Sequence, residues 1–166
     1  AKLLGLPSET DLMGYGVYNH PAGLPLGTTP AHLSAWSKIQ LGWVQPTWVF
    51  QDSMGVTIPP VETSGQVFRL WTNGQDAGEY FLLENRQKTG FDAQLPGGGL
   101  LLWHVDENRP TNTDENHYKV GLLQADGLRQ LETAANRGDA GDPFPGSRNV
   151  TSCSGTTTPN TNSFTG

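Results

Sequence analysis

The stretch Gly97–Glu107 constrains the fold more strongly than any other part of the chain. Three glycines lead into the apolar run Leu100–Val105, and an Asp-Glu pair follows it. A short apolar run of this kind is typical of a buried β-strand. Side chains alternate along a strand, so one face carries Leu100, Leu102, His104 and Asp106, and the other carries Leu101, Trp103, Val105 and Glu107. Because both faces contain apolar side chains, we predict a central strand that is covered on both sides.

His104 and Asp106 are the polar side chains on one face of this predicted strand, and they are neighbours near its end. Two interpretations of this pair are open. In one, Asp106 orients a structural His104. In the other, the two residues form a paired polar site.

Five further stretches have the length and composition of strands. They are Trp48–Gln51, Val56–Ile58, Gln66–Trp71, Tyr80–Glu84 and Lys119–Gln124. Glu84 and the following Arg86 share a face, and we expect them to form a surface ion pair worth less than about 1 kcal/mol.

Two stretches have helical character. Thr29-Pro30 suits the start of a helix. The apolar stripe that follows consists of Leu33, Trp36, Ile39 and Trp43. Asp126 suits the start of a second, short helix that ends at Gly138. Together with the strands, these helices predict a mainly β (α+β) fold. We expect an antiparallel or mixed sheet, or a sandwich, with one or two short helices packed on it.

Composition and motifs exclude several classes of protein. The 166 residues carry a net charge of −6, which argues against nucleic-acid partners because no basic patch neutralises phosphates. No apolar run is long enough for a transmembrane segment. The single cysteine, Cys153, excludes an internal disulfide framework, and the four scattered histidines alone support no zinc site. The low lysine content, with many Thr, Asn and Gly residues, leads us to expect a secreted, extracellular protein.

Hard oxygen ligands cluster around the loop that follows Gly138. Asp139 and Asp142 lie in this loop, Asn136 directly precedes it, and Asp126 lies one predicted helix away. Carboxylate and amide oxygens on a tightly turning backbone suit Ca²⁺. The spacing differs from that of an EF-hand, and the same acids also suit a helix cap and a turn. A calcium site and a structural turn therefore both remain open.

Nine segments along the chain carry a family resemblance. They are Leu4–Pro7, Asp11–Gly16, Thr29–Trp43, Tyr80–Gln87, Gly90–Asp92, Leu95–Gly97, Gly99–Glu107, Gln124–Gly127 and Gly138–Gly146. With these segments in this order along the sequence, the chain resembles the immune inhibitor A-type, M6 family of secreted metallopeptidases. The resemblance implies zinc-dependent hydrolysis of protein or peptide substrates by the full-length family members.

The zinc motif of the family is His-Glu-x-x-His-x-x-Gly, with a further ligand three residues later. With Gly5 as the motif glycine, the second histidine falls at Lys2 and the further ligand at Ser8. The resemblance therefore transfers no zinc ligand to this chain. The resemblance does imply that Met13 has the structural role of the methionine turn. It also implies an auxiliary role for Tyr15, which a tyrosine at this place has in some relatives.

The resemblance also suggests two regions and two candidate functions. Residues 1–47 are expected to be the end of a catalytic-type region, with the methionine turn and a helix, and residues 48–166 a β-rich region truncated at its C-terminal end. The first candidate is a fragment of a secreted zinc metalloendopeptidase-like protein. The alternative is a non-catalytic extracellular module with an adhesive, structural or assembly role. Zinc is not predicted for this chain alone, calcium is a candidate, and the sequence carries no signal for an oligomeric state.

Overall fold

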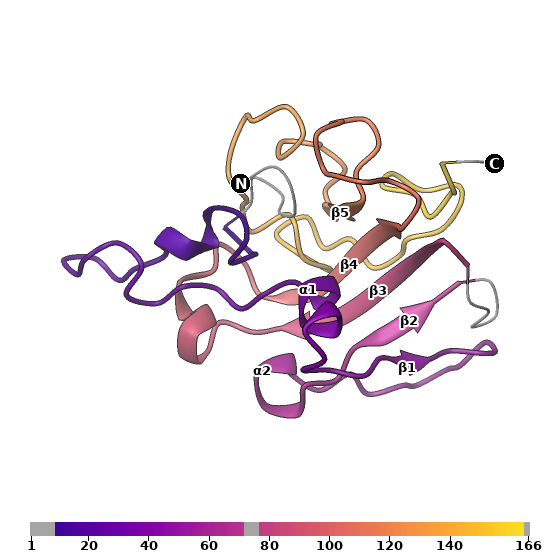
Figure 1. Ribbon diagram of the computed structural model, residues 1–166, viewed down its shortest axis with the longest axis horizontal. Helices are drawn as coiled ribbons and strands as arrows, with labels where there is room; N and C mark the ends of the chain where they lie inside the picture. Colours follow the sequence, from indigo (N-terminus) through magenta and orange to yellow (C-terminus); the bar gives the residue numbers. More distant parts are fainter. Residues whose placement is uncertain (1–8, 72–76, 165–166) are drawn as a thin grey trace.

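A computed structural model describes residues 9–71 and 77–164, and this part of the chain is built on a five-stranded sheet (Figure 1). The strands are β1 (Thr47–Trp48), β2 (Phe68–Leu70), β3 (Glu79–Arg86), β4 (Gly99–Asp106) and β5 (Val120–Leu122). The α-helices are α1 (Ala35–Gln40) and α2 (Val61–Ser64), and 3₁₀ helices span Tyr15–Tyr18 and Gly90–Gln94.

The strands lie side by side in sequence order, β1-β2-β3-β4-β5. The β1–β2 pair is parallel and the other three pairs are antiparallel, so the sheet is mixed. This architecture confirms the predicted mainly β, α+β class. The prediction of a central strand is also confirmed, because β4 is hydrogen-bonded to β3 on one side and to β5 on the other.

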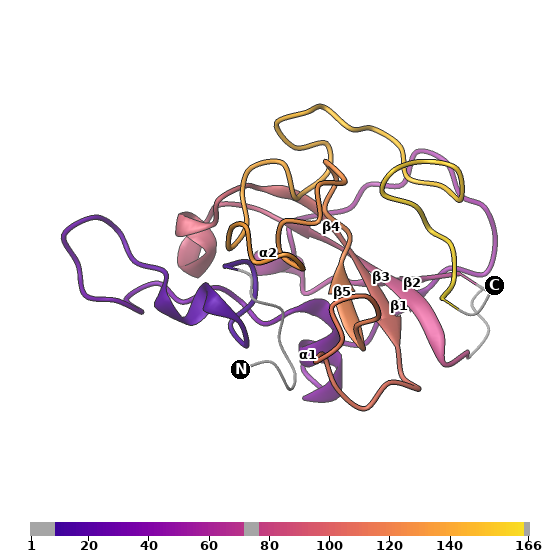
Figure 2. The ribbon, with the colours of Figure 1, turned by 90° about the horizontal axis from the view of Figure 1, so that it is seen from above.

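The alternation predicted for β4 separates two apolar clusters on opposite faces of the sheet. Leu101, Trp103 and Val105 belong to the larger cluster, which includes Trp36 of α1. Leu102 belongs to the second cluster, with Leu100 packed against its edge. Figure 2 shows α1 on one side of the sheet and the segment 144–155 on the other. Both faces of the sheet therefore have cover.

Helix α1 begins later than predicted. The predicted cap was Thr29, but the observed cap is Ser34, whose Oγ accepts a hydrogen bond from the Ser37 N–H. Residues 30–34 are not helical, because the N–H groups of His32 and Ser34 donate to side-chain carboxylates from elsewhere in the chain. The stripe also ends early, since the left-handed Gly42 stops the helix and leaves Trp43 69% exposed.

The second predicted helix, 126–138, is wrong, because this segment consists of turns. Arg129 and Ala134 have positive φ angles, which no α-helix accommodates. The side chain of Gln124 instead organises the segment, since its Oε1 accepts hydrogen bonds from the N–H groups of Gln130 and Leu131. Leu131 is still buried in the larger cluster, so its predicted burial holds without the helix.

The remaining differences concern the strands. Val56–Ile58 is not a strand, and the first, third and last predicted strands are longer than β1, β2 and β5. Residues from both predicted regions, 1–47 and 48–166, share the larger apolar cluster. Within the described residues, no helix is both long enough and apolar enough to cross a membrane.

Candidate functional site

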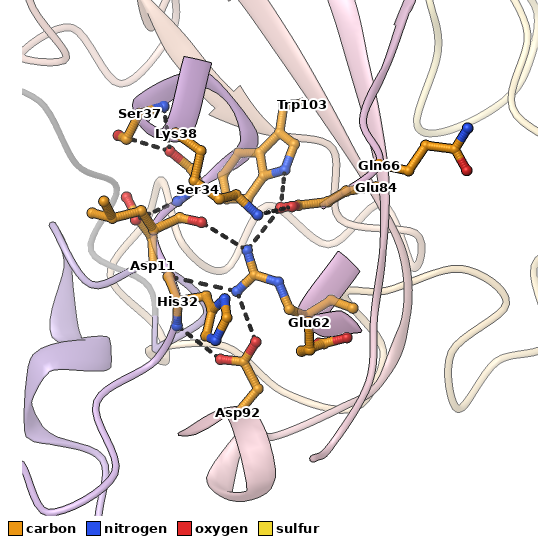
Figure 3. A network of polar contacts seen from close by, with 12 residues as sticks. Asp11, His32, Ser34, Ser37, Lys38, Glu62, Gln66, Glu84, Asp92 and Trp103 are labelled. Carbon is orange, nitrogen blue, oxygen red and sulfur yellow. Dashed lines mark hydrogen bonds and ion pairs between the residues drawn. The ribbon is translucent and has the colours of Figure 1, made fainter. Parts of the chain in front are cut away.

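Charged side chains from distant parts of the sequence meet under α1, where they form a buried network (Figure 3). Glu84 on β3 is at its centre. Its Oε2 accepts a 2.6 Å bond from Lys38 Nζ, and its Oε1 accepts from a guanidinium nitrogen of Arg86 at 2.8 Å and from Trp103 Nε1 at 3.0 Å. Glu84 and Arg86 are both fully buried, so the ion pair predicted for the surface lies in the interior.

Arg86 extends this network to the N-terminal part of the chain. Its guanidinium donates to the carbonyl oxygens of Thr10 at 3.1 Å and Leu33 at 2.9 Å, and it lies 3.4 Å from Asp92 Oδ2. Asp92 in turn accepts a 2.8 Å bond from the His32 N–H. The segment before α1 is thus fastened to the sheet through side-chain contacts.

The charges of the network stabilise one another. Burial opposes ionisation of Glu84, but Arg86 and Lys38 outweigh it and hold the pKa of this carboxyl below its ordinary value. Burial also opposes the charge on Arg86, but Glu84 and Asp92 outweigh it and raise the pKa of the guanidinium. We call Lys38, Glu84, Arg86 and Asp92 the charge network. Its two cations and two anions balance within the chain.

Asp11 links the charge network to the predicted methionine turn. Its Oδ1 accepts a 2.9 Å bond from the Ser34 N–H, and its carbonyl oxygen accepts from the N–H groups of Gly14 and Gly16. Burial raises the pKa of the Asp11 carboxyl to about 6. The first residue of the turn is therefore bonded to the segment that precedes α1.

The two residues predicted for the turn face outward to different degrees. Met13 is 39% exposed, and the ring of Tyr15 lies under the guanidinium of Arg137 at 4.2 Å. Lys2 and Ser8, which occupy the ligand positions of the zinc motif, lie outside the described residues. Within the described residues, no group of three or more His, Cys, Asp or Glu side chains is arranged to hold a metal ion. A hydrolytic zinc needs three protein ligands, and by residue type neither Lys2 nor Ser8 is the histidine or further ligand that the family motif has at these positions.

The four calcium candidates gather in one place, which we call the acidic loop: Asp126, Asn136, Asp139 and Asp142. Asn136 Nδ2 donates to Asp139 Oδ2 at 2.8 Å, and the Asp139 N–H donates to Asp142 Oδ2 at 2.8 Å. A Cβ on Gly141 would lie 2.7 Å from Asp126 Oδ2 and 3.0 Å from Asp139 Oδ1. Both carboxylates therefore approach the same glycine closely.

Asp142 is the member of the acidic loop whose buried carboxyl has the least compensation. Its side chain is fully buried, and its Oδ1 has no hydrogen-bond partner. Burial is the first cause that raises the pKa of this carboxyl to about 7, and the nearby Asp139 and Asp126 raise it further. A buried carboxylate with an unused oxygen and like-charged neighbours fits a hard cation.

His104 and Asp106 have different hydrogen-bond partners. His104 Nε2 lies 2.8 Å from Glu79 Oε1, whereas Asp106 Oδ2 lies 2.7 Å from His117 Nε2. Asp106 Oδ1 accepts from the backbone and side chain of Asn108. The end of β4 therefore holds two separate carboxylate–imidazole pairs rather than one His104–Asp106 pair.

Sequence reasoning missed several residues of these sites. Lys38 lies in a predicted helix, but no pattern in the sequence pairs it with a strand residue. Glu79 lies opposite Asp106 in the observed register of β3 and β4, but it directly precedes the predicted strand Tyr80–Glu84 and no pattern in the sequence fixes that register. His117 lies in a loop, and no local signal brings it to β4.

Comparisons of the chain with protein-family models, with curated proteins and with solved structures find no match in any of the three. The resemblance to the M6 metallopeptidases therefore depends on the sequence segments alone.

Proposed function

We propose that this chain is the part of a secreted, M6-type metallopeptidase that follows the zinc-binding helix, and that it has no hydrolytic activity alone. The observation that carries the proposal is the anchoring of the turn that contains Met13 and Tyr15. Arg86 of β3 binds the carbonyl oxygen of Thr10, directly before this turn, and Asp11 binds the Ser34 N–H. A catalytic metal site needs a rigid support, because small displacements of its groups lower the rate.

We assign a structural Ca²⁺ to the acidic loop as part of the same proposal. The loop brings three carboxylates and one amide close together, but these side chains do not yet surround a common point. The proposed ion would therefore have to draw them inward, and it would complete the roughly six to eight oxygen ligands that Ca²⁺ takes with backbone carbonyls and water. The raised pKa of Asp142 supports this assignment, because a bound cation relieves the repulsion among the acids. In this role calcium stabilises the folded domain and takes no part in hydrolysis.

A casein assay tests the absence of activity. The purified chain with added Zn²⁺ is expected to release no more peptide than a blank, because it supplies neither the zinc ligands nor the catalytic glutamate of the family motif. Cleavage above the blank that a chelator abolishes would overturn this part of the proposal.

The natural sequence that precedes Ala1 in the source gene tests the family assignment. We expect it to contain His-Glu-x-x-His, and the protein that includes it to cleave casein in a zinc-dependent manner. In that protein, Tyr15→Phe is expected to lower kcat more than it changes KM. If the upstream sequence has no such motif, the alternative of a non-catalytic extracellular module replaces the peptidase.

A further inference from the structure

The aromatic ring of Phe164 is stacked between two imidazole rings at the end of β4. Its centroid lies 4.5 Å from that of His104, with an angle of 8° between the planes. On its other side, the centroid of His117 lies at 3.8 Å and 25°. We call the space between the two imidazoles the histidine slot.

Groups other than Phe164 hold the walls of the histidine slot. Glu79 on β3 binds the Nε2 of His104, and Asp106 on β4 binds the Nε2 of His117. His104 also stacks on Phe81, with centroids 4.4 Å apart. Both walls are thus oriented by the sheet, so the slot is organised to receive a flat ring.

The slot also recognises the main chain of the residue that it holds. The backbone N–H of Phe164 donates a 2.7 Å hydrogen bond to Glu79 Oε1, the oxygen that also contacts His104. One carboxylate therefore orients a wall of the slot and binds the peptide group of the bound residue. A peptide with an aromatic side chain satisfies both contacts at once.

The segment that delivers Phe164 is shaped by its own contacts. The N–H of Thr161 donates to the carbonyl oxygen of Ser154, and Asn162 Nδ2 donates to the carbonyl oxygen of Gly155. Phe164 itself remains 43% exposed. The ring therefore lies at the surface of the molecule, next to a segment that has hydrogen bonds of its own.

We propose that the histidine slot is a binding site for the aromatic side chain of a peptide, and that this chain fills it with its own Phe164. Removal of this ring opens the slot to a peptide of the same chemistry. The proposal does not depend on the metallopeptidase assignment.

Protonation of His104 is coupled to this binding. Burial is the first cause that lowers the pKa of His104, and Phe164 covers one face of its ring. The titratable groups that face it are Glu79 from β3, Asp106 on its own strand and His117 from the loop before β5. The cavity beside it, of about 320 Å³, adds Glu115, Arg129 and Glu132. Because a buried neutral imidazole favours the filled slot, Phe164 binding weakens when His104 is protonated at acidic pH.

The test uses the Phe164→Ala variant and the acetylated, amidated peptide Asn-Ser-Phe-Thr-Gly, which copies residues 162–166. Titration is followed by NMR through the imidazole signals of His104 and His117. We expect saturable upfield shifts at pH 7.5 and weaker binding at pH 5.5. The parent chain should bind the peptide several-fold more weakly, because its tethered phenylalanine competes at a millimolar effective concentration.

Two controls complete the test. The peptide with alanine in place of phenylalanine, and the double variant Phe164→Ala with His117→Ala, should both lose binding. In the absence of peptide, Phe164→Ala should shift the two imidazole signals downfield, whereas Phe164→Tyr should leave them near their parent positions. The proposal is overturned if Phe164→Ala fails to bind the peptide, if it binds the alanine peptide equally well, or if the parent chain binds the peptide as tightly as the variant.

Discussion

The charge network and the acidic loop are both buried and polar, but they differ in how their charges are balanced. In the network, Glu84 contacts Lys38 and Arg86, so each buried charge has an opposite partner. In the loop, Asp142 is buried near two other acids, and one of its oxygens is unpartnered. Burial opposes ionisation in both places, yet only the network compensates it from within the chain. The acidic loop needs a proton or a cation from the solvent.

The same chemical change in the two regions should have opposite effects, and this is the largest difference that we expect. Glu84→Gln leaves two buried cations without their shared anion and should lower the free energy of unfolding by about 3–5 kcal/mol. Asp142→Asn removes a repelled charge and should raise the free energy of unfolding at pH 8 without calcium. Urea denaturation measures both values. A change of the same sign in both variants would contradict the comparison.

The second difference concerns calcium, which should stabilise the protein through the acidic loop and not through the charge network. At a hundredfold excess over its dissociation constant, Ca²⁺ should stabilise the parent chain by about 2.7 kcal/mol, because it binds only the folded state. The double variant Asp139→Ala with Asp142→Ala should lose this gain, whereas Glu84→Gln should keep it. Thermal melting in millimolar calcium and in EGTA is the measurement. If calcium leaves the melting temperature of the parent unchanged, the acidic loop is only a turn.

The dependence of stability on pH is the third way to test the comparison. The pKa of Asp142 is raised to about 7, so the folded state holds this proton more tightly than the unfolded chain. The stability gained in this way is complete below the ordinary carboxyl pKa and is lost as the pH rises through 7. Asp11 acts in the same direction near pH 6. Without calcium, these two carboxyls should therefore lower the stability measured by urea denaturation between about pH 4 and about pH 8, while His32 and His104, whose pKa values are lowered by burial, act in the opposite direction.

The Asp142→Asn variant isolates the contribution of the acidic loop. This variant should no longer lose unfolding free energy through Asp142 above pH 6, but it should keep the loss near pH 6 that arises from Asp11. Saturating calcium should also remove the contribution of Asp142 to the pH dependence of stability in the parent chain. If neither the substitution nor calcium changes the pH profile, protonation of Asp142 does not contribute to the pH dependence of the unfolding free energy.

Local patterns predicted the strand elements better than the helical ones. The alternation along Leu100–Val105 gave the correct faces of β4, because the period of two persists over the whole strand. The predicted helix 126–138 failed because the side chain of Gln124, just before it, binds the N–H groups of Gln130 and Leu131, which the pattern of apolar residues does not reveal. Trp43 matched the apolar stripe in spacing but lies beyond the residue that ends α1.

The candidate sites were predictable where their members are close in sequence. The acidic loop was identified in advance, because Asn136, Asp139 and Asp142 lie within seven positions of one another. The expected direct pairing of His104 with Asp106 was not observed. Their partners, Glu79 and His117, come from other segments, and no short-range pattern links them.

The sequence by itself determined the central strand, its two faces, the mainly β class and the clustering of acids after Gly138. These features depend on the spacing of apolar and acidic residues over a few positions. Side-chain direction repeats regularly along the backbone, so this spacing fixes which side chains share a face. Tertiary structure alone decided that Glu84 and Arg86 are buried, and that Phe164 reaches a slot on β4. Burial and long-range contacts depend on which segments cover a side chain, and local spacing carries no information about segments far away in the chain.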